Sequence, residues 1–429
     1  MKFLALLLIV LLLLVPDLSR GQSSGSEEGS ANETDARLQA RLVEAAALMD
    51  QVAPGHRGAE SDIQKITRIV ELLEAAAKLV PETGRKNYFQ ALAEATKTGD
   101  FSKSNLFWGR QENHRVDMVF YQSKPQKKRK GATTLAVFAL NTESMTRLAR
   151  LQSVEDKLRT NTVLKKQASL VARSLDFSEF FIADLVPPVL ISNPVLVHPP
   201  RLSPDENGYK VLLFRNMIQD HFDRRMVKIS KLLFPPSLQT FVEFDAYFLH
   251  FLLHHMAHGW GPFLVEASQD NPITVEKRLK KYFYTVEEIK ADTAAACALP
   301  TLIKEKILDP RVEKKVLCTY VLHLLTFVSS GDTGRQTEPC VAQLNFLLEN
   351  EGIVYDIEKS AILIDFSRMK GVVERLLERV IKIETGANLQ DAKRLVEAYS
   401  KSSSVIQRIR DITKPFWIEE KTHGGTVSE

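Results

Sequence analysis

The sequence predicts a helix-rich α+β fold with a minority of strands, and three observations support this prediction. Apolar residues recur at helical spacing over most of the chain, and a few short apolar runs between turn residues read as strands. The chain has 429 residues, 44% hydrophobic and 26% charged, which suits a soluble globular protein of two or three domains or one two-lobed domain. Only three cysteines occur, Cys297, Cys318 and Cys340, so the fold rests on its apolar core, although one disulfide of unknown pairing is open.

The N-terminal residues have the pattern of a secretory signal peptide. An unbroken apolar run at residues 3–15 follows one basic residue, and Pro16, Ser19 and Gly21 come after it. The run is too short to cross a bilayer, which takes about 20 apolar residues. We therefore predict that residues 1–21 are removed by cleavage near Gly21, with an uncleaved anchor as the alternative.

We expect the mature chain to be secreted. No later segment is long and apolar enough to span a membrane, and the C-terminal residues carry no ER-retrieval signal, which disfavours the ER lumen as its location. Residues 22–36 are rich in Ser, Gly and Glu, and we expect a flexible lead-in there. This segment holds Asn32, the asparagine of the only glycosylation sequon, and we predict that it is modified.

The first part of the mature chain is predicted to form helices followed by a strand pair. Apolar residues recur at helical spacing from Arg37 onwards. A second helix is predicted to begin with a capping box formed by Ser61 and Gln64. Two strands follow, at Val116–Gln122 and Thr133–Leu140.

The middle of the chain is predicted to mix helix and extended structure. A basic run at 124–131 joins the two strands; we interpret it as a solvated hairpin loop, with a convertase cleavage site or a polyanion-binding patch as alternatives. Residues 154–182 are predicted to be helical, and a Pro-rich stretch at 186–204 is predicted to be extended. An Asn-Gly turn then leads into an apolar strand at Lys210–Phe214.

The C-terminal half is predicted to be mainly helical. Helical patterns dominate from about residue 217 to 350. A short hairpin is predicted at Ile353–Ile357 and Ala361–Phe366, and two amphipathic helices, at about 367–384 and 389–400, are predicted to close the chain.

The candidate chemistry lies in a cluster of histidines. The chain has 10 histidines, and His250, His254, His255 and His258 fall within one helical segment. At about 100° per residue, His254 and His258 project from one face a turn apart, which is the geometry by which two imidazoles bind one zinc ion. Buried structural histidines produce the same spacing, so this pair alone does not define a metal site.

A second helical segment, thirty residues further on, supplies acidic residues. Glu288 and Asp292 lie four residues apart on one face of it. Two histidines and one glutamate make a three-ligand zinc site with an open fourth position, and an aspartate nearby orients a ligating histidine. For Glu287 and Glu288 alone, a solvated helix start is the alternative interpretation.

These residues resemble the motifs of the dipeptidyl peptidase III-like zinc proteins, in particular the branch found C-terminal to some Nudix hydrolase domains. That branch carries H-E-x-x-H-G-x-G-P, which corresponds here to 254–262, and E-E-A-K-A-D, which corresponds to 287–292. Residues 342–352 resemble its A-L-Q-F-N-W-L-x-E-K-G segment, and Leu42–Asp50 resembles its opening helix. The resemblance covers about residues 37–415.

The resemblance implies a zinc-peptidase-like fold of two lobes, with a cleft between a helical metal lobe and a mixed α/β lobe. It assigns 37–415 to this domain, with the metal motifs in 241–292, and leaves 416–429 as a C-terminal tail. It also implies zinc as the cofactor and His254, His258 and Glu288 as its ligands. Asp292 and His250 would then lie in the outer shell, and the cleft would accept a small molecule or a peptide.

The sequence departs from the family at the catalytic position. His255 stands where H-E-x-x-H has its Glu, the group that takes a proton from the metal-bound water. The segment 327–340 also lacks the arginines and the histidine that the family places there. We therefore expect a zinc-binding protein that has lost peptide hydrolysis and acts by binding.

Two alternatives remain open from the sequence. One is an active zinc-dependent enzyme, a metallopeptidase or another hydrolase, that uses His255 in place of the usual Glu. The other is an interaction protein that binds no metal, with the histidines packed or exposed. The near balance of 57 basic and 53 acidic residues gives no reason to expect a nucleic-acid partner, and the oligomeric state is not predicted.

Overall fold

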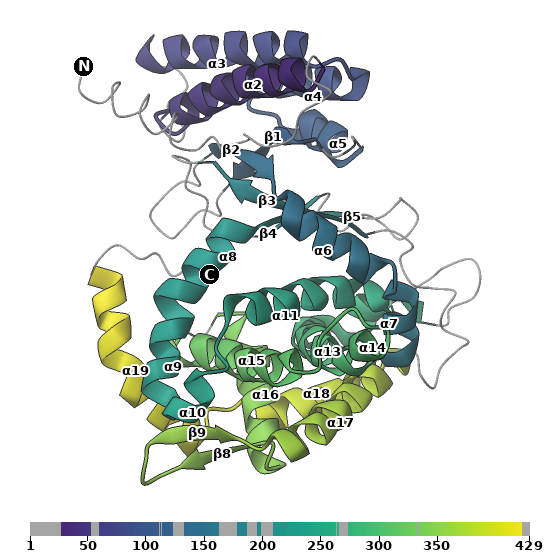
Figure 1. Cartoon of the computed structure of the whole chain (residues 1–429), viewed down its shortest axis with the longest axis vertical. Coiled ribbons are helices and arrows are strands. Elements are labelled where there is room, and N and C mark those ends of the chain that lie inside the picture. The colour runs from purple at the N-terminus through teal and green to yellow at the C-terminus, as the bar shows by residue number, and fades with distance from the viewer. Residues whose placement is uncertain are drawn as a thin grey trace.

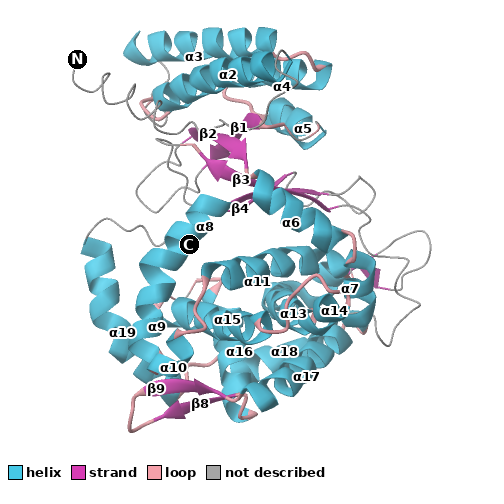
Figure 2. Cartoon of the chain, viewed as in Figure 1, coloured by secondary structure: helices cyan, strands magenta, loops and turns pink. Residues whose placement is uncertain are grey.

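The structure is a computed structural model in which two lobes lie on either side of a five-stranded sheet (Figures 1 and 2). It describes residues 27–52, 60–110, 112, 114–122, 133–162, 178–186, 195–198, 209–262, 264–265, 273–332 and 334–422. The predicted signal peptide, the basic run and the Asn-Gly turn lie outside the described residues. The helix-rich α+β class and the two-lobed fold are confirmed.

The N-terminal lobe is a layer of helices over one face of the sheet (Figure 1). Its helices are α2 (Glu27–Met49), α3 (Glu60–Leu79), α4 (Thr83–Thr98) and α5 (Ser102–Arg110). The residues predicted to be a flexible lead-in are helical from Glu27 onwards, because Arg37 pairs with Glu33 one turn earlier and Arg115 donates to Asn32 Oδ1 at 2.7 Å. Ser61 lies inside α3 rather than at its N-cap, so the predicted capping box is wrong.

The sheet is mixed, with strand order β1-β2-β3-β5-β4. Strands β3 and β5 pair in parallel, and the other neighbours pair antiparallel. The bounds are β1 (Val116–Gln122), β2 (Thr133–Leu140), β3 (Ser178–Leu185), β4 (Val195–His198) and β5 (Tyr209–Phe214). The predicted strand pair has the bounds that were expected, and β5 confirms the third predicted strand.

Strand β3 explains one wrong prediction. Residues 154–182 were expected to be helical, but only α7 (Glu155–Thr162) is a described helix there, and Ser178–Leu185 is a strand. Phe180 and Ile182 pack into the core of the C-terminal lobe, whereas Phe181 and Ala183 pack into the core of the N-terminal lobe. A strand buried on both faces has a continuous apolar run without alternation, which periodicity alone cannot distinguish from a helix.

The C-terminal lobe is almost entirely helical (Figure 2). It is connected to the sheet by α6 (Thr142–Gln152), α7 and α8 (Arg215–His221), and α8 continues through a π-helical segment, Phe222–Met226, into α9 (Val227–Leu233). The remaining helices are α10 (Pro236–Gln239), α11 (Phe244–Ala257), α12 (Val275–Leu279), α13 (Phe283–Cys297), α14 (Leu299–Lys304), α15 (Val312–Ser329), α16 (Thr337–Glu349), α17 (Phe366–Thr385), α18 (Leu389–Tyr399) and α19 (Ser404–Thr422). Two short strand pairs complete it: β6 (Leu264–Val265) with β7 (Ile273–Thr274), and β8 (Ile353–Asp356) with β9 (Ala361–Ile364).

The C-terminal end differs from the prediction by one helix. The hairpin β8–β9 and the helices α17 and α18 confirm the predicted elements, but α19 follows them and reaches Thr422. Trp417 on α19 is buried in the core of the C-terminal lobe, and its indole N–H donates to Ser329 Oγ at 3.0 Å. The lobe therefore extends past residue 415, where we expected a tail to begin.

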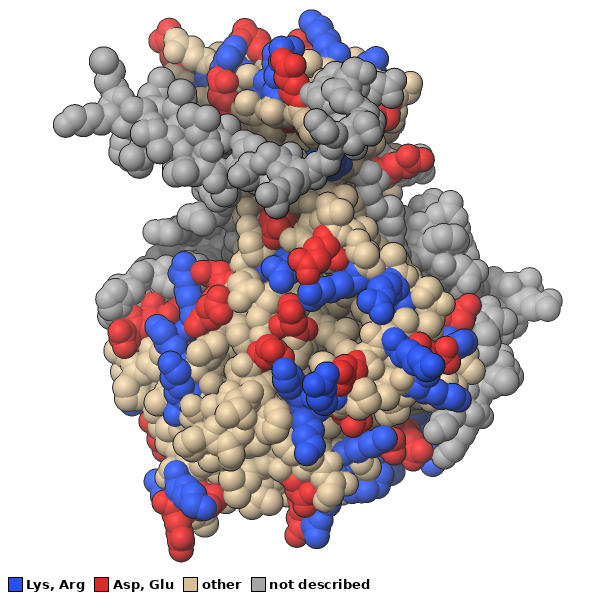
Figure 3. Space-filling view, viewed as in Figure 1, with Lys and Arg blue, Asp and Glu red and all other residues tan. Residues whose placement is uncertain are grey.

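The described residues also bear on the possible disulfide and on membrane-spanning segments. No disulfide links Cys297, Cys318 and Cys340 to one another, so the disulfide that the sequence left open is not found. Among the described helices, none combines the length and the apolar character needed to cross a bilayer. On the face shown in Figure 3, basic and acidic side chains are interspersed over the C-terminal lobe.

Candidate metal centre

The candidate centre lies where α11 packs against α13 in the middle of the C-terminal lobe (Figure 1). Helix α11 ends at Ala257, and His258 opens a short 3-10 turn that continues to Trp260. Gly261 then has φ 72°, a conformation that favours glycine, so the chain turns away immediately after the second histidine of the pair. Both histidines are thereby held on the α13 side of α11.

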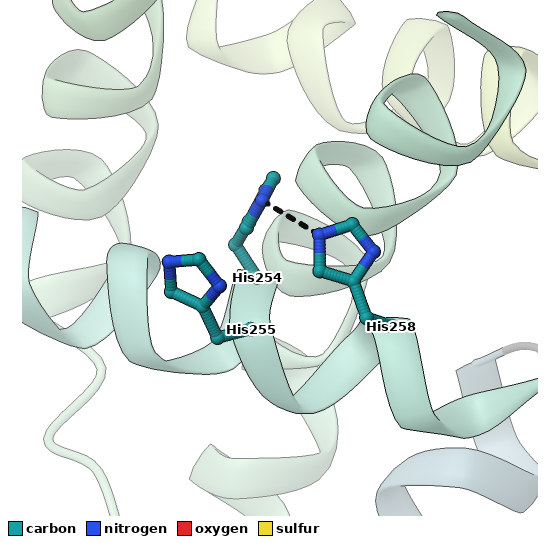
Figure 4. A group of neighbouring side chains, drawn as sticks. All are labelled: His254, His255 and His258. Carbon is teal, nitrogen blue, oxygen red and sulfur yellow. Dashed lines mark hydrogen bonds between the residues drawn. The ribbon is translucent and has the colours of Figure 1, made fainter. Parts of the chain in front are cut away.

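The two predicted histidine ligands point at one place. His254 Nε2 lies 3.1 Å from His258 Nε2, with the rings nearly perpendicular (Figure 4). Glu288 on α13 faces the same place: its carboxylate oxygens lie 3.5 Å from His254 Nε2 and 4.0 Å from His258 Nε2. Tetrahedral zinc holds its ligand atoms about 3.3 Å apart at Zn–N distances of about 2.0–2.1 Å, so these three side chains fit a metal ion.

A carboxylate orients each imidazole from behind. Asp292 Oδ1 lies 2.8 Å from His254 Nδ1, and Glu287 Oε1 lies 2.8 Å from His258 Nδ1. An ionised carboxylate only accepts hydrogen bonds, so each Nδ1 carries a proton, and it is Nε2 of each ring that would offer a lone pair to a metal ion. Two lone pairs 3.1 Å apart repel each other unless a cation or a proton lies between them, which also fits a metal site.

The orienting aspartate is held by a buried chain of hydrogen bonds. Gln343 on α16 donates from Nε2 to Asp292 Oδ2 at 2.8 Å, and Tyr320 on α15 donates from its hydroxyl to Gln343 Oε1 at 2.7 Å. His250, one turn before His254, is buried with its Nε2 3.3 Å from the Asp292 carbonyl oxygen. His250 therefore contacts the backbone of the orienting residue and not the metal position.

The orienting glutamate belongs to a second buried chain. Lys290 donates from Nζ to Glu287 Oε2 at 2.9 Å and to the Gly261 carbonyl at 3.3 Å. On its other side Lys290 Nζ lies 3.6 Å from Glu384 Oε2 on α17, and both side chains are fully buried. Burial raises the pKa of Glu384 well above its usual value, which disfavours its charged form, and Lys290 lies nearer to Glu287, at 2.9 Å, than to Glu384.

The electrostatics of the centre favour a cation. Burial alone would lower the pKa of His254, but the charges of Asp292 and Glu288 raise it to about 10. Burial likewise opposes ionisation of Glu288 and Asp292, yet the neighbouring histidines hold the pKa of both carboxyls below their usual values. Ionised carboxylates facing buried imidazoles create a negative site that a bound cation neutralises.

His255 lies beside His254 and His258, and its imidazole ring has no carboxylate oxygen. Its ring packs edge-on against Phe251 at 4.6 Å between centroids, and its centroid is 5.0 Å from that of His254. The ring nitrogens of His254, His255 and His258 come within 4.8 Å of one another, so these three residues could hold a metal ion (Figure 4). Burial, together with the neighbouring histidines, lowers the pKa of His255 well below its usual value.

A cationic side chain contacts Tyr284, which lies one turn before Glu288 on α13. The guanidinium of Arg335, in the segment where the family arginines are missing, stacks 3.9 Å from the ring centre of Tyr284. Tyr284 precedes Glu288 by one turn of α13, and burial and the nearby Glu288 charge raise the pKa of its hydroxyl. Sequence spacing did not single out this pair.

The structure brings His254, His258, Glu288 and Asp292 together as the sequence predicted, while their role as metal ligands stays a prediction. A solvated helix start was the alternative interpretation for Glu287 and Glu288 alone; Glu287 is only 6% exposed and orients His258 instead. Asn32, the predicted glycosylation site, lies on α2 of the other lobe and is exposed. Three further residues of the centre, Gln343, Tyr320 and Glu384, were missed as site residues.

The chain is similar to one curated protein in sequence and to several solved structures in fold. No protein-family model matches the sequence. Nudix hydrolase 3 of Arabidopsis thaliana is 22% identical over 345 residues, which are 77% of this chain and 43% of that protein, so the chain spans under half of its relative's length. The Nudix part of the resemblance is therefore distant and partial.

Solved structures give the stronger likeness. The structure of dipeptidyl peptidase III from Caldithrix abyssi matches with a TM-score of 0.71 and 21% identity, covering 83% of this chain and 69% of that one. Dipeptidyl-peptidase III from Corallococcus sp. strain EGB matches with a TM-score of 0.66 and 17% identity, covering 95% of this chain and 81% of that one. At these identities the likeness shows the fold alone: the chain has a dipeptidyl peptidase III-like, two-lobed fold.

Proposed function

We propose that this is a secreted, zinc-binding, peptidase-like protein that has lost peptide hydrolysis and acts by binding a ligand or a protein partner in the cleft between its lobes. One observation carries the proposal. His254 Nε2, His258 Nε2 and the Glu288 carboxylate converge on one point. His255 occupies the sequence position where the family has its catalytic glutamate.

Zinc suits this donor set better than Ca²⁺ or Mg²⁺ does. Two imidazole nitrogens and one carboxylate form a three-ligand arrangement that catalytic zinc sites use, whereas Ca²⁺ and Mg²⁺ prefer oxygen ligands alone. Zinc ligation also requires neutral imidazoles with the second ring nitrogen fixed by an acceptor. Asp292 and Glu287 provide those acceptors at 2.8 Å each.

The loss of hydrolysis follows from the chemistry of His255. A general base must accept a proton from water at the operating pH, and its contribution is typically about 10²–10⁴-fold in rate. The family's Glu takes the proton through a carboxylate oxygen, whereas the His255 ring has no carboxylate and packs edge-on against Phe251 at 4.6 Å between centroids. Peptide hydrolysis therefore lacks its proton acceptor even with the metal bound.

A ligand with an anionic group is supported by Arg335. Its side chain is exposed, and the Tyr284 ring holds the guanidinium in place by a cation–π contact at 3.9 Å. A guanidinium presents a planar set of donors that matches a carboxylate, such as the terminus or an acidic side chain of a peptide. We infer that Arg335 contacts such a group in the bound ligand.

The test of lost hydrolysis compares three versions of the protein on a peptide library: wild type, His255→Glu and the matched His255→Gln. We expect turnover only in His255→Glu, because that variant alone regains a carboxylate at the base position, and we expect a chelator to abolish it. Chelator-sensitive turnover by the wild type would overturn the proposal.

An active enzyme that uses His255 as its base is the second candidate. The observation in its favour is that one ring nitrogen of His255 comes within 4.8 Å of a ring nitrogen of His254 and of His258. This candidate requires turnover by the wild type and its loss in His255→Ala, with zinc content unchanged. The library assay above therefore separates the two functions.

Secretion and glycosylation have an independent test. Expression of the full chain in eukaryotic cells should deliver the protein to the medium with its N-terminus at about residue 22, because the leader has the signal-peptide pattern. A glycosidase should shift the mass of the wild type but not of Asn32→Gln. Retention in the cytosol with an intact leader would contradict the proposal.

A further inference from the structure

His255 occupies an unusual place among the histidines of the centre. It follows His254 directly on α11, and the three rings of His254, His255 and His258 stand next to one another (Figure 4). The ring nitrogens of the three residues come within 4.8 Å of one another. The centroid of the His255 ring lies 5.0 Å from that of His254 and 6.0 Å from that of His258.

No described residue forms a hydrogen bond with a ring nitrogen of His255. Among the residues that the structure describes, His254 and His258 each bond a carboxylate through Nδ1, and His250 contacts a carbonyl oxygen, but His255 makes only ring contacts. Neither ring nitrogen belongs to the buried side-chain atoms that lack a hydrogen-bond partner, so a nitrogen of His255 remains available to a ligand. A metal ion at the point where His254 and His258 converge would satisfy one of those nitrogens.

We propose that His255 is a fourth protein ligand of the metal, and that it takes the position that a water molecule holds in a catalytic site. Ligand atoms of tetrahedral zinc lie about 3.3 Å apart, so the largest of the present separations, 4.8 Å, has to shorten by about 1.5 Å. A change of the His255 rotamer would supply that movement. The result is a closed site of three imidazoles and Glu288.

A closed site changes what the metal does. Four protein ligands leave no open position for water or for a substrate carbonyl, which is the difference between structural and catalytic zinc. The metal then fastens α11 and the 3-10 turn that follows it, which together supply three ligands, to α13, which supplies one. This inference rests on the proposed zinc site and explains the loss of hydrolysis by a blocked coordination position as well as by a missing carboxylate.

The test is X-ray absorption at the zinc edge, which counts imidazole ligands without any assay of activity. The proteins are the zinc-loaded full-length wild type, His255→Gln, and the control His221→Gln, in which the changed histidine lies on α8 and stacks on Phe327 at 6.3 Å. We expect three imidazoles in the wild type and in His221→Gln, and two in His255→Gln. We also expect His255→Gln to bind zinc more than about 100-fold more weakly, because loss of an outer-shell partner alone costs about 10–100-fold.

The outcomes distinguish this inference from the proposed function. One zinc with two imidazoles in the wild type would overturn the fourth-ligand role and leave the zinc site standing. Absence of zinc from the wild type would overturn the proposed zinc site itself. Cobalt-substituted protein gives a second readout: a closed site predicts that azide leaves the visible spectrum unchanged, whereas a shift of the spectrum on adding azide would show an open position and contradict the inference.

Discussion

Glu287 Oε1 lies 2.8 Å from His258 Nδ1, although Glu287 is the residue immediately before the candidate ligand Glu288 on α13. Two consecutive glutamates therefore face the same centre in different roles, one towards the metal position and one behind an imidazole. Lys290 makes this arrangement stable, since its buried ammonium lies 2.9 Å from Glu287 Oε2. The positive charge of Lys290 lets the buried Glu287 carboxylate remain ionised and accept a hydrogen bond from the Nδ1–H group of His258.

Glu287→Gln should weaken zinc binding by about 10–100-fold, measured on the fraction of the variant that remains folded. The amide keeps the shape of the side chain but loses the charge that stabilises the His258 imidazole as a ligand. Competition with a chromophoric chelator measures the affinity. Glu374→Gln, on the exposed side of α17, is the matched control and should bind zinc as the wild type does. Equal affinities for both variants would show that Glu287 does not orient His258.

Tyr320→Phe should lower the free energy of unfolding by about 1–3 kcal/mol. The Tyr320 hydroxyl donates to Gln343 Oε1 at 2.7 Å, and both side chains are fully buried, so its removal leaves a buried acceptor without a donor. Urea unfolding of the zinc-free protein measures the change. Tyr282→Phe serves as the control, because Tyr282 is partly exposed and its change should stay within about 0.5 kcal/mol. A Tyr320→Phe protein as stable as that control would rule out the chain from Tyr320 to Asp292.

Removal of the metal should destabilise the C-terminal lobe. A ligand that binds only the folded state at 100 times its Kd adds about 2.7 kcal/mol to the free energy of unfolding. We expect a chelator to lower the melting temperature and added zinc to restore it, because the metal joins α11 to α13. The His254→Ala/His258→Ala variant should melt at one temperature with or without zinc. Zinc-dependent stabilisation of that variant would place the metal elsewhere.

Acid should destabilise the protein in part through His221. Burial, with the nearby Arg225 charge, lowers the pKa of His221 from 6.5 to about 3. The folded state thus disfavours the protonated ring, so this contribution to stability is complete above pH 6.5 and is lost as the pH falls towards 3. Between pH 6 and pH 4 the free energy of unfolding should fall less steeply in His221→Gln than in the wild type. The two slopes should differ by about 1.4 kcal/mol per pH unit. Equal slopes in urea unfolding at these pH values would contradict the assignment.

Much of the centre could be predicted because its ligands follow helical geometry. His254 and His258 are four residues apart on one helix, and Glu288 and Asp292 are four apart on another, so each pair shares a face. The resemblance to a zinc-peptidase branch then indicated that the two faces meet. Local spacing and short motifs were sufficient for these four residues.

The supporting residues could not be predicted in the same way. Gln343, Tyr320 and Glu384 come from α16, α15 and α17, and their contacts with the centre depend on how these helices pack. Glu287 appeared to be a surface residue because a charged residue at a helix start is usually solvated. Its burial is explained only by Lys290 and His258 in three dimensions.

The errors in the fold also have physical causes. Strand β3 was interpreted as helix because the sheet lies between two cores and buries both of its faces. Helix α19 was missed because Pro415 lies inside it, and an internal proline normally ends a helix. The helix continues because Trp417 beyond the proline is buried in the core.

The most direct test of the account is the zinc content of the purified protein after expression with ample zinc. We predict about one equivalent of zinc in the wild type and less than about a tenth of an equivalent in His254→Ala/His258→Ala, because two of the ligands are then missing. Mass spectrometry of the metal measures both values. Less than about a tenth of an equivalent in the wild type, or a full equivalent in the double variant, would contradict the metal centre described above.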